Sequence, residues 1–289
     1  MKIFSGIFEK SNQTKDGIIS IGVFDSFHRG HQALLHDLVT LSKKEGLETF
    51  VLTFRIPPRK DNQLNVLELN DKLSFIESTG VENVILCDFD EYFSNLNGFE
   101  FVRLLEKNFN ITNYYIGEDF RFGFNKTGSK ELIEKSGYKV FLEETFKIDN
   151  KKVSTSQIKK YIKDGTLEGI EQCLGRHYYI KGIVKMGKQL GRTIGYPTMN
   201  IINSEVLYPI NGAYISITEI NGVSYKSMTF VDSSIIETHL IGYEKFEYNF
   251  SIKVNFIKKL RNNISFETLD LLKVQLESDL MATKQFFNI

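Results

Sequence analysis

The sequence has 289 residues, enough for about two domains of ordinary size, each with its own core. Hydrophobic residues make up 42% and charged residues 25%, a globular balance that excludes a disordered or fibrous chain. Because 36 Lys and Arg side chains balance 36 Asp and Glu, the overall charge favours neither nucleic acid nor an acidic membrane surface. We therefore expect small-molecule partners, with no nucleic acid and no membrane among them.

The cysteines and the N-terminal residues indicate the cellular compartment. Cys87 and Cys173 lack the spacing of a metal knuckle or a disulfide framework, so we expect buried thiols in a reducing compartment. Residues 1–10 reach charged side chains too early for a signal peptide, and no run of about 18 apolar residues follows. These features predict a cytoplasmic protein.

In the first half of the chain, strand patterns alternate with amphipathic helix patterns. The sequence predicts strands over residues 18–24, 49–54, 83–89, 113–117 and 138–142. Helices are predicted over residues 31–45, 71–79 and 129–136, each followed by a glycine that can end it. This alternation indicates an α/β, Rossmann-like domain whose parallel sheet binds ligands at the carboxyl ends of its strands.

In the second half the pattern changes. Two short helices are expected between residues 153 and 174, and alternating strands follow Gly175. Residues 213–220 and 223–230 form a predicted hairpin around an Asn-Gly turn, and residues 248–257 alternate again. A last helix is predicted near residues 265–287, with Ser265 as its N-cap. We expect two domains, residues 1–174 and 175–289, the second an antiparallel β-barrel with a C-terminal helix.

Two of the five histidines lie in one turn, where the first strand leads into the first helix. A helix start offers unpaired N–H groups and a positive dipole end, so it can bind a polyphosphate that glycine lets approach closely. His28 and His31 could then donate to phosphate oxygens and stabilise the charge that builds up during nucleotidyl transfer. In the alternative without a functional role, one histidine caps the helix and the other faces solvent. A zinc site would lack a clear third ligand.

The His-x-Gly-His turn resembles the signature of the nucleotidyltransferase superfamily that includes class I aminoacyl-tRNA synthetases. Residues 116–123, with the later Gly128, look like the flavin-side loop of bacterial FAD synthetases. Residues 153–159 are similar to that family's Ser-Ser-Thr-x-x-Arg nucleotide loop, with Lys159 in place of the arginine. Taken alone, this segment could also be an ordinary Ser/Thr helix cap. The resemblance implies transfer of AMP from ATP to FMN, with release of pyrophosphate.

The resemblance also implies site residues. His28 and His31 are expected to be catalytic, and the ATP-binding residues to be Gly22, Phe24, Asp25, Gly30, Ser154, Thr155 and Ser156. The flavin-binding residues of this domain are expected to be Asp119, Phe120, Arg121 and Phe122. Two segments depart from the family. Ser26 replaces a glycine, which would add strain of about 1 kcal/mol if positive φ is required. The segment from Thr53 to Pro58 lacks a usual histidine.

A second motif covers residues 182–200, where spaced glycines precede Pro197-Thr198-Met199-Asn200. Clustered glycines let backbone amides wrap a phosphate chain. The Thr198 hydroxyl and the Asn200 carbonyl are hard oxygen ligands suited to Mg²⁺. In the alternative, the glycines only turn a barrel corner that Asn200 caps.

This second motif resembles the riboflavin kinase module of bifunctional bacterial riboflavin kinase/FAD synthetases, as do residues 174–178, 212–214 and 260–261. The resemblance implies phosphorylation of riboflavin to FMN by ATP, with Glu237 of a Glu-x-His strand as the base. The other implied residues are Gly187, Gly191 and Gly195 for ATP, Thr198 and Asn200 for Mg²⁺, and Arg261 for the flavin. ATP, FMN and riboflavin are substrates, and no redox cofactor is needed.

Residues 227–234 depart from the kinase pattern, because the glycine and proline of the family's Asn-x-Gly-x-x-Pro-Thr-Phe segment are absent. One alternative is therefore an FAD synthetase with a degenerate kinase-like domain, and another is a non-catalytic flavin or nucleotide sensor. A third is adenylyl transfer to another acceptor, such as a nicotinate or pantetheine phosphate. The loop at residues 117–123 and the barrel pattern argue against that third alternative.

Overall fold

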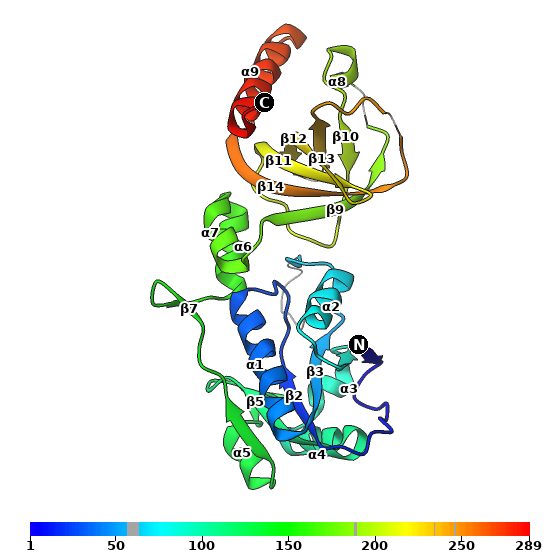
Figure 1. The fold of residues 1–289 in the computed structure, drawn as a ribbon, viewed down its shortest axis with the longest axis vertical. Coiled ribbons are helices and arrows are strands. Elements are labelled where there is room, and N and C mark those ends of the chain that lie inside the picture. The colour runs from blue at the N-terminus through cyan, green and yellow to red at the C-terminus, as the bar shows by residue number, and fades with distance from the viewer. Residues whose placement is uncertain (57–63, 188–189, 234, 246) are drawn as a thin grey trace. The chain divides into compact units, whose positions relative to one another are not determined.

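The computed structural model describes residues 1–56, 64–187, 190–233, 235–245 and 247–289 (Figure 1). The chain forms two compact units, one of Met1–Gln63 with Leu67–Ser154 and the other of Leu64–Val66 with Thr155–Ile289. Helices α6 (Thr155–Asp164) and α7 (Leu167–Leu174) belong to the second unit, where α7 packs on α6 and on barrel strands. The predicted domain boundary between residues 174 and 175 stays a prediction.

The first unit contains a parallel sheet of six strands in the order β1-β4-β3-β2-β5-β6. Its strands are β1 (Lys2–Phe4), β2 (Gly17–Ile21), β3 (Glu48–Phe54), β4 (Asn83–Cys87), β5 (Ile111–Ile116) and β6 (Lys139–Leu142). This confirms the Rossmann-like prediction. The strand order reverses between β2 and β5, so the ligand crevice of such a sheet falls at the carboxyl ends of these two strands.

Helices cover this sheet, as its apolar strands require. Phe101, Leu105 and Phe109 of one helix share a buried cluster with alternate sheet residues such as Ile19 and Leu52. The strand residues between those point to the opposite face, and α1 contacts β2 and β3. The helices are α1 (Arg29–Glu45), α2 (Leu69–Ser78), α3 (Glu91–Asn95), α4 (Gly98–Phe109) and α5 (Lys130–Lys135), with a short 3₁₀ turn η1 (Phe124–Lys126) and a small hairpin of β7 (Lys147–Ile148) and β8 (Lys151–Lys152).

The structure corrects two predictions in this unit. The strand predicted over residues 18–24 is β2, and it ends at Ile21. The chain turns there, and Phe24 takes a left-handed backbone with φ 52°. Helix α4 was not predicted, although Asn97 and Glu100 form a capping box at its start and the helix is strongly amphipathic. The other predicted helices and strands are present with small differences at their ends.

The second unit is a closed antiparallel barrel in the order β10-β13-β12-β11-β14-β9, as predicted. The Asn221-Gly222 hairpin is confirmed, since both residues have positive φ. The predicted strand 248–257 lies instead at Ser251–Asn262. The elements are β9 (Tyr178–Lys185), α8 (Leu190–Thr193), β10 (Met199–Ile201), β11 (Gly212–Ile220), β12 (Val223–Asp232), β13 (Ile235–Leu240), β14 (Ser251–Asn262) and α9 (Leu269–Phe287).

Helix α9 runs beside the barrel and contacts β12 (Figure 1). The prediction of Ser265 as its cap is wrong: the Thr268 side chain accepts a hydrogen bond from the Leu271 N–H, so the helix starts later. Cys87 and Cys173 are buried and free, as expected. Within the described residues, no helix has both the length and the apolar character needed to cross a bilayer.

Candidate active sites

The turn after β2 carries the predicted histidines at the strand-order switch. Phe24 and Phe27 both have left-handed backbone, with φ of 52° and 43°, whereas Ser26 between them does not. The strain expected from a serine replacing glycine is therefore absent at that position. A Cβ on Gly22 would lie 3.0 Å from the Phe24 ring, so the absence of a side chain there lets this buried ring fold back.

The two imidazoles lie together at the start of α1. Their rings stack with centroids 3.7 Å apart and planes 14° apart, and the Phe24 ring meets His31 edge-on at 4.9 Å. A Cβ on Gly30 would lie 3.1 Å from the His28 ring, so glycine makes room for the stack. The structure thus brings four of the predicted site residues, His28, His31, Gly30 and Phe24, into one cluster.

Hydrogen bonding sets the protonation of this pair. The His31 N–H donates to Nδ1 of His28 over 3.2 Å, so His28 caps α1 and its neutral ring carries the proton on Nε2. Burial, and then the repulsion that His31 would meet if His28 were also protonated, hold the pKa of His31 well below its ordinary value. A buried imidazole such as His31, whose protonation is disfavoured in the free protein, is suited to gain an anion, which would supply the missing stabilisation.

The loop after β5 is fixed by close backbone contacts with the start of α4. A Cβ on Gly98 would lie 2.5 Å from Gly128 Cα, and one on Gly123 would lie 2.6 Å from the Gly98 nitrogen. The Gly98 N–H donates to Thr127 Oγ1 at 3.0 Å, and the Phe124 N–H donates to the Leu96 carbonyl at 2.7 Å. The unpredicted helix α4 is therefore the support of this loop, and its capping box was the available signal.

The predicted flavin-side residues of that loop differ in exposure. Asp119 and Arg121 are exposed, and Phe120 is half-buried. The Phe122 ring is buried and stacks on Phe120 with ring centroids 5.4 Å apart, and the centroid of the Phe101 ring of α4 lies 5.2 Å from it. Phe122 thus belongs to the core that supports Phe120.

The carboxyl end of β3 shows a buried charge that the sequence reasoning missed. Lys72 of α2 is only 4% exposed, and its ammonium donates to the Phe54 carbonyl over 2.5 Å. The adjacent Thr53 hydroxyl donates to the carbonyl of Val23 in the histidine turn, over 3.0 Å. Two side chains therefore tie the end of β3 to its surroundings. Pro57 and Pro58 of the predicted segment lie outside the described residues.

The predicted nucleotide hydroxyls stand at the start of α6. Ser154 is the last residue of the first unit, while Thr155 and Ser156 form the first turn of α6 in the second unit. Ser154 and Thr155 are half-buried, and Ser156 is exposed. Asp25, the remaining predicted ATP residue of the histidine turn, is buried at 3% exposure.

In the barrel, strand register brings two predicted residues face to face. Asn200 of β10 pairs directly with Glu237 of β13, so their side chains share one face of the sheet. The Asn200 Oδ1 atom is buried and has no hydrogen-bond partner among the described residues. A Cβ on Gly187 would lie 2.2 Å from Asn200 Nδ2, so this glycine forms the cradle of the amide.

The remaining predicted residues of this motif border the same face. Gly191 has no room for a side chain, because a Cβ would lie 2.3 Å from the Tyr196 carbonyl, and Gly195 has φ of 91°. The Pro197 carbonyl lies 2.9 Å from Nδ1 of His239, and burial lowers the pKa of His239. Thr198 precedes β10 two residues before Asn200. Lys188 and Gln189 of the motif lie outside the described residues.

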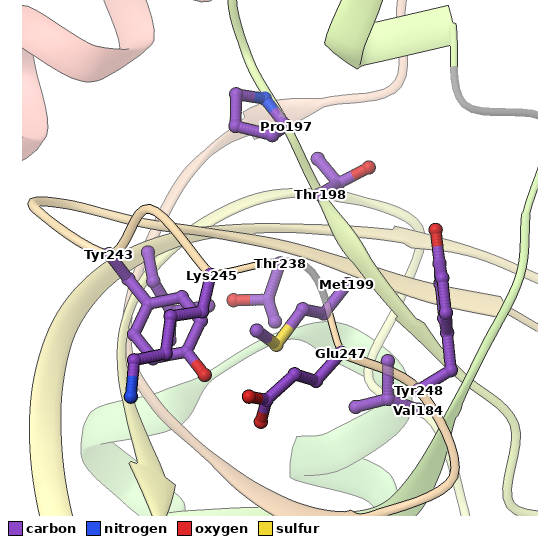
Figure 2. Close-up of a pocket in the computed structure, with 10 residues that line it drawn as sticks. Val184, Pro197, Thr198, Met199, Thr238, Tyr243, Lys245, Glu247 and Tyr248 are labelled. Carbon is purple, nitrogen blue, oxygen red and sulfur yellow. The ribbon is translucent and has the colours of Figure 1, made fainter.

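A pocket opens beside Thr198 on the inner side of the barrel wall (Figure 2). Figure 2 shows Met199 and Thr238 between the rings of Tyr243 and Tyr248, with the Glu247 carboxylate near them. Met199 and Thr238 are direct strand partners, so this pocket lies behind the Asn200–Glu237 pair, on the opposite face of the same strands.

Arg261, predicted to bind flavin, is held by an acidic side chain of α9. Its guanidinium donates from Nε to both carboxylate oxygens of Asp279, each at 3.0 Å, and from one terminal nitrogen at 2.6 Å. Asp279 is buried and also accepts from Gln275 at 2.9 Å. This pair anchors α9 to the end of β14.

Comparison with known proteins follows the same division of the chain. The FAD synthetase family model matches residues 10–157, and the riboflavin kinase family model matches residues 174–287. The chain is 30% identical over 311 residues to the bifunctional riboflavin kinase/FMN adenylyltransferase of Escherichia coli K12, covering all of this chain and 99% of that one. The protein of that name from Bacillus subtilis is 29% identical, with 96% of this chain and 95% of that one covered.

Among solved structures, one named a macrolide-efflux protein from Streptococcus pneumoniae has the same fold, with a TM-score of 0.88 and 25% identity over 98% of both chains. The two family models and the full-length relatives agree on a different name, and they account for both units. The chain therefore belongs to the family of bifunctional riboflavin kinase/FMN adenylyltransferases.

Proposed function

We propose that the chain makes FAD in two steps, phosphorylation of riboflavin in the barrel and adenylyl transfer to FMN in the Rossmann-like unit. The stacked His28–His31 pair at the strand-order switch is the observation that carries the second step. We assign residues 1–174 and 175–289 to the two activities. Two buried free thiols support a reducing cytoplasmic location.

In the adenylyl transfer, an oxygen of the FMN phosphate attacks the α-phosphorus of ATP. The bond from that phosphorus to the bridging oxygen breaks, and pyrophosphate leaves. The Nε2–H of His28 donates to a triphosphate oxygen, with His31 beside it, so donors are in place where charge develops. Gly22, Phe24, Asp25 and Gly30 shape the nucleotide floor, with Ser154, Thr155 and Ser156 as further phosphate or ribose donors.

For the acceptor, we assign the flavin to the loop after β5. Phe120 is half-buried on top of the buried Phe122, which leaves ring surface for the isoalloxazine, and the exposed Asp119 and Arg121 offer polar contacts. The glycine contacts with α4 hold this loop in place before the flavin binds.

In the kinase step, the Glu237 carboxylate accepts the proton of riboflavin's terminal hydroxyl, whose oxygen attacks the γ-phosphorus as ADP leaves. The buried Oδ1 of Asn200, which has no partner among the described residues, fits a divalent cation, and so does the hydroxyl of Thr198, two residues earlier in the chain. Mg²⁺ bound there with ATP would offset phosphate charge. Gly187, Gly191 and Gly195 belong to the segment assigned to the phosphates, where Gly187 and Gly191 allow close packing on Asn200 and Tyr196. Arg261, oriented by Asp279, borders the flavin.

One assay tests both steps. The full chain is supplied with riboflavin, ATP and Mg²⁺, and FMN, FAD and pyrophosphate are followed. In parallel, FMN is supplied to His28→Ala, His31→Ala and, as matched control, the exposed His36→Ala on the same helix. We expect His36→Ala to keep the wild-type rate of FAD formation and each site variant to lose about 100- to 1,000-fold. Wild-type FAD formation by folded site variants would refute the assignment.

The β12–β13 turn favours a second candidate, an enzyme that only makes FAD. Asp232 of β12 pairs directly with Ile235 of β13, and the sequence between residues 227 and 234 lacks the glycine and proline of the kinase pattern. The riboflavin assay separates the two candidates: FMN formation selects two activities, and FAD made only from supplied FMN selects one.

A further inference from the structure

The interior of the barrel contains a closed ring of buried hydroxyls. Ser216 of β11 lies 2.7 Å from Ser227 Oγ and 2.6 Å from Thr229 Oγ1, both on β12. Thr218 of β11 lies 2.8 Å from Ser227 Oγ and 3.2 Å from Thr238 Oγ1 of β13, and Thr229 reaches Thr238 at 2.8 Å. All members of this hydroxyl ring are 0% exposed: Ser216, Thr218, Ser227, Thr229 and Thr238.

Hydrogen-bond direction can be followed around the hydroxyl ring. Thr229 donates to Thr238, so its only proton is used there, and the Ser216 proton serves the Ser216–Thr229 contact, with the Ser227 carbonyl at 3.1 Å as a second acceptor for it. Ser227 then donates to Ser216, Thr218 to Ser227, and Thr238 to Thr218. Within the ring, each hydroxyl donates once and accepts once. Such a complete polar network is directional, and removing one member leaves two buried partners short of a hydrogen bond.

The hydroxyl ring ends at the strand that carries the proposed base. Thr238 follows Glu237 directly, and side chains alternate along a strand, so a Thr238 held inward directs Glu237 to the outer face. Asn200 meets Glu237 there through β10, which has only three residues. Two ring members, Ser227 and Thr229, come from the segment that departs from the kinase pattern.

We propose that the hydroxyl ring is the positioning element of the kinase site: it fixes β13 so that Glu237 faces Asn200. The inference rests on the proposed kinase function. Its physical basis is that apolar core contacts tolerate small sliding movements, whereas the five hydroxyls stay within hydrogen-bond distance of one another only while β11, β12 and β13 keep their positions.

The test compares full-length Thr229→Val, which is close in shape but lacks the hydroxyl, with Thr229→Ser, which keeps it. Ser224→Ala, an exposed hydroxyl on the same strand, is the matched control. Rates of FMN formation are measured over riboflavin and ATP concentration, and FAD formation from supplied FMN serves as an internal reference. Hydrogen exchange of peptides containing residues 199–201 and 235–240 is followed without substrate.

For Thr229→Val we expect kcat for FMN formation to fall at least about tenfold, because misplacement by about 1 Å can cost a hundredfold. KM values should stay within about twofold, exchange in both peptides should rise, and FAD formation should be unchanged. Thr229→Ser and Ser224→Ala should match the wild type. Unchanged exchange and kcat in Thr229→Val, or equal losses in Thr229→Ser, would overturn the proposal. Should the wild type make no FMN, the kinase proposal fails and the exchange result alone decides whether the ring fixes β13.

Discussion

The histidine turn and the Asn200–Glu237 pair place their side chains by different means. In the turn, neighbouring residues converge because the backbone is forced into left-handed conformations at Phe24 and Phe27, each costing about 1–3 kcal/mol. In the barrel, residues far apart in sequence converge through strand register, and neither β10 nor β13 contains a left-handed residue. A locally strained backbone therefore shapes the first site, whereas pairing between distant strands aligns the residues of the second.

This difference predicts that substitutions in one unit leave the other unit's chemistry unchanged. The largest effect is expected for Glu237→Gln, which keeps the shape of the side chain but removes the proton acceptor. We expect FMN formation to fall about 100- to 10,000-fold, the usual contribution of a general base. Initial rates with riboflavin and with supplied FMN measure both activities, and Glu205→Gln is an exposed control. A kinase rate within twofold of wild type would remove Glu237 from the mechanism.

Gly187→Ala tests the cradle of the barrel site without touching a proposed ligand. The added methyl would come within 2.2 Å of Asn200 Nδ2, so the amide must move. We expect kinase activity to fall about tenfold or more, with a raised Mg²⁺ requirement and unchanged FAD formation from FMN. Gly222→Ala at the hairpin tip, where a Cβ meets nothing within 4 Å but φ is 80°, is the control for backbone strain that does not touch the amide. Equal Mg²⁺ dependence in Gly187→Ala and wild type would contradict this reading.

Lys72→Met tests how much the buried Lys72 ammonium at the end of β3 contributes to the stability of the first unit. Removing a charged donor to a buried carbonyl should lower the free energy of unfolding of the first unit by about 1.5–3 kcal/mol. Urea denaturation of the full chain, followed by loss of adenylyl transfer and of FMN formation separately, gives the two transitions. The exposed Lys10→Met should leave both midpoints unchanged. An unchanged urea midpoint for loss of adenylyl transfer in Lys72→Met would show that this ammonium does not stabilise the first unit.

The smallest effect concerns pH. His31 has a lowered pKa, so below its ordinary value of 6.5 the unfolded chain binds a proton that the folded chain does not. Stability of the first unit should therefore fall as pH drops below about 6.5 and be level above it, with a slope of at most about 1.4 kcal/mol per pH unit from this group. Melting without nucleotide between pH 7.5 and 5.5 should show a smaller acid loss in His31→Asn than in His36→Ala. Equal losses would count against a buried neutral His31.

The same contrast explains what could be predicted from the sequence. The histidine cluster could be predicted from the sequence, because His28 and His31 lie within one turn of helix and the strand before them is apolar. The pairing of Asn200 with Glu237 could not be worked out from spacing, because register between distant strands depends on the whole barrel.

Long-range contacts also account for the features that were missed. The Lys72 contact with the Phe54 carbonyl joins a helix to a strand end, and no local pattern signals it. Helix α4 carried a readable signal, the Asn97–Glu100 capping box. The left-handed Phe24 was missed because bulky residues rarely adopt that backbone, and only the surrounding packing makes it acceptable.

The glycine contacts between the flavin-side loop and α4 have a practical consequence for redesign of the acceptor. A Cβ on Gly98 would lie 2.5 Å from Gly128 Cα, and a Cβ on Gly128 would lie 2.5 Å from the Phe122 ring, so even a methyl group at either position would displace part of the loop. A library aimed at flavin analogues should therefore spare the glycines and randomise Asp119, Phe120 and Arg121, whose side chains can change without moving the chain that carries them.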